Sequence, residues 1–392
     1  MRSRTPLAQI KRLQELGWRR GLRYRERMGC VRTGGCLVAL LLMSCGSDGA
    51  SRSGPALELR ADVQTCLPDV SAGMPALLSD TGCFADLKTL EPGPDLIPYD
   101  VNSALWTDGA FKPRYMVVPS PEQIAIQDDG SWVFPNGSVL IKVFGFEFDV
   151  GDPQSRRAVE TRFMVRNGAA WEYSTYQWND EGTEGELLEA RKTIEYTIQE
   201  RGEAKILKYQ FPEYDDCVTC HGPAINDVLG PKTSQINRDR DYGGLVANQL
   251  VAMEEIDLLE RDEDEEIDPN AEPRMANPQM GEGTLDERAR AYLDANCSHC
   301  HRPNGYASSS DHGLDFRHEL PLEDTGMCDA MKYFPEWAGL PRIAPGNPEG
   351  SGILQRFLVE NELRMPSTGA STVDPFGAEL LRDWIAQMNA CP

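Results

Sequence analysis

The chain has 392 residues, and its 39 Lys and Arg residues are outnumbered by 62 Asp and Glu residues, which gives a formal net charge of −23. Residues 1–44 hold ten of the basic and two of the acidic residues, so the remainder carries 29 basic and 60 acidic side chains, a net charge of −31. A surface this acidic repels nucleic acid and anionic lipid, so nucleic-acid binding is excluded and a basic redox partner is favoured.

The N-terminal segment has the pattern of an export signal. Arg32 precedes the apolar run 37–43, and small residues flank Cys45. The run is shorter than the roughly 20 apolar residues that a membrane-spanning helix needs. We therefore predict that residues 1–44 are an over-extended start, with Met28 as the initiator, followed by a lipoprotein signal peptide. The alternative is a plain signal peptide in which Cys45 is incidental.

Lipidation of Cys45 would anchor the exported chain to a membrane. Gly46 lacks the acidic charge associated with retention at the inner membrane. The expected location is therefore the periplasmic side of the cell envelope, at the outer membrane, with residues 45–62 as a flexible tether.

Residues 63–211 are expected to form an antiparallel, sandwich-like β domain. Short β-branched and aromatic runs alternate there with Gly, Pro, Asp and Asn, which is typical of strands joined by turns. Since no histidine precedes His221, this half cannot supply a Ser-His-Asp or zinc-hydrolase site, and a scaffold or docking role is expected. The clearest strand candidates are Arg114–Val118, Val139–Phe144, Thr161–Val165 and Trp171–Tyr176.

The pattern Cys-x-x-Cys-His occurs twice, at Cys217, Cys220 and His221 and again at Cys297, Cys300 and His301. It is the pattern of covalent haem attachment. Two thiols separated by two residues can add to the two vinyl groups on one edge of a porphyrin, and the next imidazole can bind the iron. We therefore predict two covalently bound c-type haems, with His221 and His301 as iron ligands.

Two other interpretations use the same four cysteines. Together they could bind one zinc ion, but the histidine after each pair would then have no role. A thioredoxin-like dithiol is the other interpretation, but its CxxC opens a helix after a strand and usually lacks the trailing histidine. Covalent haem accounts for all six residues.

Residues 284–392 are expected to form a mainly helical cytochrome c domain around the second haem. A capping box at 284–287 begins a helix that leads into Cys297, and Asp374 precedes a second helix. Met365 lies between them in a polar loop and is followed by proline. A thioether there can bind the iron opposite His301 and raise its potential, so Met365 is the predicted distal ligand, the alternative being a core side chain.

Residues 212–283 are expected to form the first haem region, with a helix over Leu245–Glu260 and an acidic linker after it. The distal position of this haem could be open or taken by a methionine. The candidates are Met253, which fits core packing better, Met275 and Met280.

The remaining histidines have no decisive context. His299 lies inside its own motif and is expected to be a spacer. His312 and His318 are loop residues that could contact or bind a haem.

Four further cysteines follow Cys45 outside the two motifs. An exported chain meets an oxidising environment, where unpaired thiols are disfavoured. The simplest pairing keeps each bond within one expected domain and predicts the disulfides Cys66–Cys83 and Cys328–Cys391.

Six stretches carry a family resemblance: Leu78–Phe84, Ile97–Gly109, Tyr176–Asp180, Cys217–His221, Gln235–Asp239 and Ala291–Cys297. On these the chain resembles a family of uncharacterised exported bacterial dihaem c-type cytochromes. The resemblance spans nearly the whole mature chain, and Ile97–Gly109 is its most specific tract. It implies haem binding and electron transfer, with no known substrate.

Single-electron transfer through two haems is thus the leading functional prediction. The alternative is a dihaem oxidoreductase, a peroxidase or a small-molecule dehydrogenase, in which one haem keeps an open position for substrate. A binding module with structural haems is a third possibility. The expected architecture is α+β and multidomain, with the β domain followed by the helical haem regions.

Overall fold

The computed structural model divides the chain into two compact units, Met1–Arg52 and Ser53–Pro392. The structure describes Leu57 and residues 60–222, 228–261, 266–310, 313–331, 337 and 339–392. The expected signal peptide, Cys45, most of the tether, His312 and much of the acidic linker lie outside the described residues. Within the described ranges, no helix combines the length and apolar character needed to cross a membrane.

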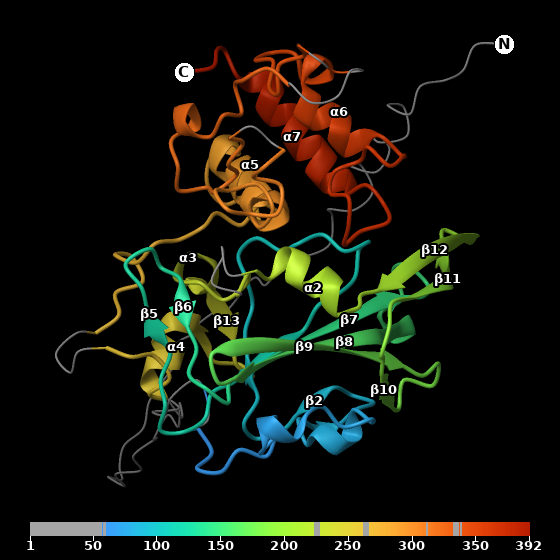
Figure 1. Ribbon diagram of the computed structural model, residues 1–392, viewed down its shortest axis with the longest axis vertical. Helices are drawn as coiled ribbons and strands as arrows, with labels where there is room; N and C mark the ends of the chain where they lie inside the picture. The colour runs from blue at the N-terminus through green and yellow to red at the C-terminus, as the bar shows by residue number, and fades with distance from the viewer. Residues whose placement is uncertain are drawn as a thin grey trace, which may run out of the picture. The chain divides into compact units, whose positions relative to one another are not determined.

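A six-stranded antiparallel sheet forms the centre of the second unit, in the order β10-β9-β8-β7-β4-β3 (Figure 1). Its strands include the four strand candidates except Val118, so the expected β content of this region is confirmed and the chain is of the mixed α+β class. The strands are β3 (Ile97–Pro98), β4 (Arg114–Val117), β7 (Val139–Glu147), β8 (Arg156–Asn167), β9 (Ala170–Trp178) and β10 (Gly185–Leu187).

The other described strands form two-stranded antiparallel ribbons. The longest is a hairpin whose two strands pair from Lys192 opposite Phe211 to Glu200 opposite Glu203. The ribbons are β1 (Phe84–Asp86) with β2 (Glu91–Pro92), β5 (Ala125–Ile126) with β6 (Trp132–Val133), β11 (Lys192–Glu200) with β12 (Glu203–Phe211), and β13 (Asp239–Asp241) with β14 (Val246–Asn248).

The two faces of the central sheet are buried by different parts of the chain. Because side chains alternate along a strand, Ile141 and Phe163 share one face, where they pack with the N-terminal segment and its Cys66–Cys83 disulfide. Leu140 lies on the opposite face and joins a core with helix α4. On that face Phe144 packs against the β11–β12 ribbon. Figure 1 shows the blue N-terminal segment and α2 on opposite sides of the sheet.

The expected helices of the C-terminal region form where their capping signals lie. Thr284 and Glu287 make the reciprocal capping box that begins α5, and Asp374 caps α7. A buried hydrogen bond of 2.9 Å from the Tyr292 hydroxyl to Asp374 joins the two helices. The predicted disulfide Cys328–Cys391 is present and ties the C-terminus to the segment before α6.

Among the described residues of the second unit the helices are short, and several of them are 3₁₀ turns. The α-helices are α2 (Tyr214–Cys220), α3 (Thr233–Ile236), α4 (Gln249–Glu255), α5 (Leu285–Leu293), α6 (Gly352–Leu358) and α7 (Pro375–Gln387). A turn of π-helix, η5 (Asp294–Ser298), extends α5. The 3₁₀ turns are η1 (Val70–Ala72), η2 (Ser79–Thr81), η3 (Pro153–Ser155), η6 (Leu322–Asp324) and η8 (Pro348–Gly350).

The helix predicted over Leu245–Glu260 has wrong bounds at both ends, because α4 covers only Gln249–Glu255. Its first residues pair with β13 as strand β14, and the Asn248 side chain then caps α4 by accepting a hydrogen bond from Leu250 N. The helix ends at Glu255, and Asp257 has a positive φ of 58° that breaks it. The apolar spacing was correct only for the middle of the segment.

Candidate functional site

Helix α2 carries the first Cys-x-x-Cys-His motif. Glu213 and Asp216 form its capping box, and Asp216 also binds the Arg191 guanidinium at 2.6 Å. The two cysteines lie one helical turn apart, and His221 is the C-cap residue, whose N–H donates to the Cys217 carbonyl at 2.8 Å. The sequence pattern predicted no helix over 214–220, whereas α2 begins three residues after the end of strand β12.

Tyr173 of strand β9 holds both ends of α2. Its hydroxyl donates to the His221 carbonyl at 2.8 Å, and its ring lies 5.6 Å from the imidazole of His221 and 5.7 Å from the ring of Tyr214. The first motif is therefore fixed to the face of the sheet opposite the N-terminal segment.

The second motif continues directly from α5 and η5. The N–H groups of Cys300 and His301 donate to the Cys297 carbonyl at 3.1 and 3.0 Å, so the motif keeps one tight turn. Phe316 N donates to the His301 carbonyl at 3.1 Å, and its ring stands edge-on to the imidazole at 5.4 Å. Each motif thus has an aromatic residue against its terminal histidine.

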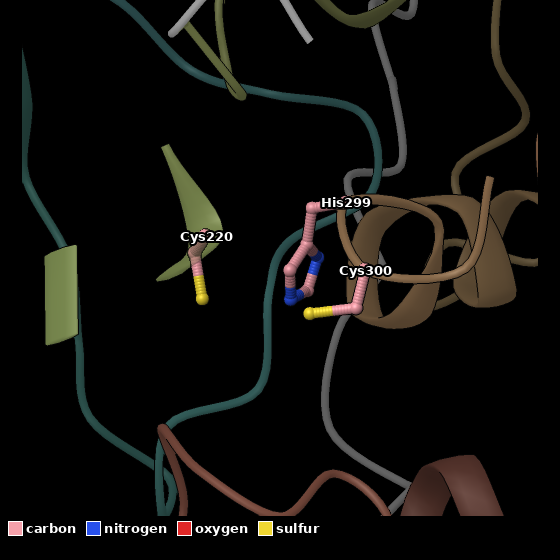
Figure 2. A group of neighbouring side chains, drawn as sticks. All are labelled: Cys220, His299 and Cys300. Atoms are coloured by element: carbon pink, nitrogen blue, oxygen red, sulfur yellow. The ribbon is translucent and has the colours of Figure 1, made fainter. Parts of the chain in front are cut away.

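The two motifs, which are about eighty residues apart in sequence, meet in the structure. The ligand atoms of Cys220, His299 and Cys300 all lie within 4.8 Å of one another. Figure 2 shows the two thiols and the imidazole turned toward one another. A hydrogen bond with the Cys300 thiol and the nearby His299 lower the pKa of Cys220. The zinc interpretation had placed the two motifs together but without His299, which was expected to be a spacer.

The four motif cysteines are the only free thiols among the described residues, since the other four described cysteines form the two disulfides. Burial raises the pKa of Cys217 to about 11 and that of Cys297 to about 12. Each motif offers two unpaired thiols followed by an imidazole. This donor set fits a covalently attached haem, which uses two thioethers and one histidine.

The tract around Trp106 joins the second motif to the β domain. Asn296, the residue before Cys297, accepts a hydrogen bond from Trp106 N at 2.7 Å. Its amide nitrogen donates to the Ala104 carbonyl at 3.3 Å. Asp108 accepts from the backbone N–H groups of Ser371 and Thr372 at 2.8 and 2.7 Å. We name residues 104–108 the clasp, because they bind the C-terminal region at two points, Asn296 and the backbone of Ser371 and Thr372.

Asp294 is the centre of a buried charge network next to the second motif. Its carboxylate is 5% exposed and lies 3.0 Å from the Lys232 ammonium and 2.9 Å from Nδ1 of His318. Burial opposes ionisation, but Lys232 and His318 hold the pKa of Asp294 well below its usual range. Burial lowers the pKa of His318, whereas its hydrogen bonds to Asp294 and Glu319 raise it, and the net shift is upward.

Asp294, His318 and Glu319 also come close enough to surround a metal ion. The Lys232 ammonium, however, is within 3.3 Å of both oxygens of Asp294. A fixed positive charge there disfavours a cation. His318, one of the two loop histidines that could contact a haem, therefore has a described role as a partner of Asp294.

The candidate distal methionines occupy different environments. Met365 lies on the loop between α6 and α7, partly buried, and its N–H donates to the Arg356 carbonyl at 2.8 Å. Met253 is fully buried in the core that includes Leu250, as its helical spacing indicated. Met275 is also fully buried, whereas Met280 is 70% exposed.

A comparison of the chain with protein-family models, with curated proteins and with solved structures found no match. The chemistry proposed for the site therefore rests on the residues described above.

Proposed function

We propose that this protein is an exported dihaem c-type cytochrome that transfers single electrons. The observation that carries the proposal is the pair of Cys-x-x-Cys-His motifs, whose four thiols are free while the other described cysteines are bridged. Cys217 and Cys220 would form the thioethers of the first haem, and His221 would bind its iron. Cys297, Cys300 and His301 would do the same for the second.

The protein's contribution is to hold these groups. Tyr173 and Phe316 orient the two histidines by packing on their rings and donating hydrogen bonds to their carbonyls. Met365 is the proposed distal ligand of the second haem, and its thioether would favour the reduced iron. Bound haem supplies an iron that takes up and releases one electron. Cys220 and Cys300, one from each motif, lie close together, so the two attachment sites would adjoin each other.

Two finer features of the architecture belong to the same proposal. Residues 284–392 would form a cytochrome c-type domain around the second haem, with α5 and α7 as its main helices. The β domain would be sandwich-like, because the β11–β12 ribbon lies over the central sheet and encloses the core around Phe144. Lipid-modified Cys45 would anchor the chain on the periplasmic side of the outer membrane, where its acidic surface would attract a basic redox partner.

Haem counting on motif variants tests the proposal. The full-length protein, produced with the cell's haem-attachment machinery, should contain two haems per chain by pyridine haemochrome assay. The variants Cys217→Ala/Cys220→Ala and Cys297→Ala/Cys300→Ala should each contain one. Cys328→Ala/Cys391→Ala, which removes two cysteines outside the motifs, is the matched control and should retain two. A full-length protein without haem would overturn the proposal.

The convergence of Cys220, His299 and Cys300 supports a second candidate, a metal site. Two thiolates and one imidazole form a three-ligand set suited to zinc. In that case the purified chain would contain one zinc ion and no haem, and His299→Ala would release the metal. In the haem interpretation, His299→Ala leaves the haem count at two.

The coordination of the first haem distinguishes an electron carrier from the alternative function, a dihaem oxidoreductase. Low-temperature EPR of the oxidised protein should show two low-spin six-coordinate irons if the chain is a carrier. A high-spin signal that shifts on addition of peroxide would instead indicate an open position for substrate.

A further inference from the structure

Three cations stand in one row across the central sheet. Arg114 on β4 is paired directly with Lys142 on β7, and Lys142 is paired directly with Arg162 on β8. Directly paired residues of an antiparallel sheet project from the same face. Lys112 lies two residues before Arg114, and its positive charge contributes to lowering the pKa of Lys142. We name these four residues the cationic row.

Like charges placed directly opposite each other destabilise a sheet unless an anion compensates them. Only Arg162 has such a partner, Glu160, whose carboxylate binds its guanidinium at 2.7 and 2.9 Å. Among the residues that the structure describes, no carboxylate lies within ion-pair distance of Lys112, Arg114 or Lys142. Among the described residues, Glu160 is thus the one carboxylate that pairs with any of the four basic side chains of the row.

Three further carboxylates that act on the row, Asp374, Asp108 and Asp100, are engaged elsewhere. Asp374 accepts from Tyr292 and caps α7. Asp108 accepts a hydrogen bond from the backbone of Ser371, and Asp100 pairs with Arg240. These three carboxylates influence the row only from a distance.

The cations are also poorly hydrated. Burial and the neighbouring Arg114, Lys112 and Arg162 hold the pKa of Lys142 well below its usual range. Burial likewise lowers the pKa of Lys112 to about 7. Yet Arg162 keeps 29% of its side chain accessible. Lys112, Arg114 and Lys142 are also partly exposed, so an anion from solvent could reach all four side chains.

The cationic row lies next to the first motif. Arg162 is paired with Thr175, and the neighbouring Met164 is paired with Tyr173, the residue that contacts His221. Arg162 is also near enough to Cys217 to stabilise a negative charge on its sulfur. The cationic row, the thiol of Cys217 and the ring of Tyr173 thus share one face of the sheet.

We propose that Lys112, Arg114, Lys142 and Arg162 form an anion-binding recess that receives carboxylate groups beside Cys217. The inference rests on the proposed function in one respect: the propionates of a haem on Cys217 and Cys220 are the nearest source of carboxylates. A free dicarboxylate, such as a small organic acid, has the same chemistry and is the alternative source.

The variant Lys142→Met tests the recess in the haem-loaded, full-length protein. A cation near a haem favours the reduced iron, because reduction removes one positive charge from the group. Lys142→Met should therefore lower the midpoint potential of the first haem and leave that of the second unchanged. The first haem is identified as the one that Cys217→Ala/Cys220→Ala lacks. Lys208→Met removes the same charge from an exposed position, 71% accessible on β12, and should change neither potential. Equal potentials in wild type and Lys142→Met would overturn haem propionates as the occupant.

A titration with succinate shows which carboxylate occupies the recess. If propionates fill the recess, adding succinate at constant ionic strength should change neither the potentials nor the unfolding midpoint of the wild type. If a free acid fills it, succinate should raise the unfolding midpoint saturably, and Lys142→Met should weaken its binding by about tenfold or more, about 1.4 kcal/mol. The unfolding measurement also applies to a chain that carries no haem, so it separates failure of this inference from failure of the proposed function. If neither the Lys142→Met potentials nor the succinate titration responds, the recess binds no anion.

Discussion

Asn296, the residue before Cys297, accepts a hydrogen bond from the backbone N–H of Trp106 at 2.7 Å, although the two residues are 190 positions apart. The side-chain amide of Asn296 also donates to the Ala104 carbonyl and to the Tyr292 carbonyl. One buried side chain thus links the second motif, the helix before it and the clasp.

Asn296→Ala should weaken this link. The change leaves buried backbone groups without a partner, which costs about 1–3 kcal/mol for each such group. We expect a matching loss of free energy of unfolding in urea, with no change in haem content. Asn389→Ala, at an exposed position near the C-terminus, is the control and should unfold like the wild type. Equal stability of the two variants would show that the hydrogen bonds between Asn296 and the clasp do not stabilise the fold.

Lys232→Met should destabilise the protein by about 1.5–3 kcal/mol, the range for a hydrogen bond to a charged group. The buried carboxylate of Asp294 would lose its ammonium partner. Lys232 keeps 27% of its side chain exposed, so the full cost of an unpaired buried charge is not expected. The double variant Lys232→Met/Asp294→Asn should recover part of the loss, and a further loss of the same size would argue against the pairing.

The same network predicts a pH dependence of stability. The pKa of His318 is raised in the folded protein, so its contribution is fully present below about pH 6.5, the unfolded pKa, and is lost as pH rises through the folded pKa. The pKa of Asp294 is lowered, so its contribution is lost only as pH falls below the unfolded value of about 3.9. Urea unfolding between pH 5 and about pH 9 should show the first loss. His318→Gln should remove it; an unchanged pH profile in that variant would assign the effect to another group.

The two disulfides should contribute unequally. They close loops with sequence separations of 17 and 63 residues, and the chain-entropy relation gives about 3 and about 4 kcal/mol. Cys328→Ala/Cys391→Ala should therefore lose more free energy of unfolding than Cys66→Ala/Cys83→Ala. Thermal unfolding under non-reducing conditions measures both, and the opposite order would show that strain or unfolded-state structure outweighs loop entropy.

Met365→Ala tests the proposed distal ligand. Loss of the thioether should lower one midpoint potential and convert one iron to the high-spin state. Met74→Ala is the matched control, because Met74 is partly buried like Met365 and is not a candidate ligand. If Met365→Ala leaves both potentials and both spin states unchanged, the second iron has another distal ligand.

Local signals in the sequence predicted the parts of the fold that depend on neighbouring residues. The capping box at Thr284 and the Asp374 cap mark the helix starts that the structure has, and the β-branched runs mark β4, β7, β8 and β9. Both disulfides followed from counting cysteines. These features need only a few residues of context.

Features that depend on strand register and long-range packing could not be predicted. The cationic row exists only because Arg114, Lys142 and Arg162 fall opposite one another, and no local pattern defines that register. The meeting of Cys220 with Cys300 depends on the clasp and on the Lys232–Asp294 pair, which join distant segments. The shortening of the helix at α4 follows from the pairing of β14 with β13.

The intact mass of the exported, full-length protein tests the central claim most directly. The account predicts the mass of the processed polypeptide and its lipid plus two haems, which stay attached under denaturing conditions because Cys217, Cys220, Cys297 and Cys300 hold them covalently. A mass equal to that of the polypeptide and its lipid alone would contradict it.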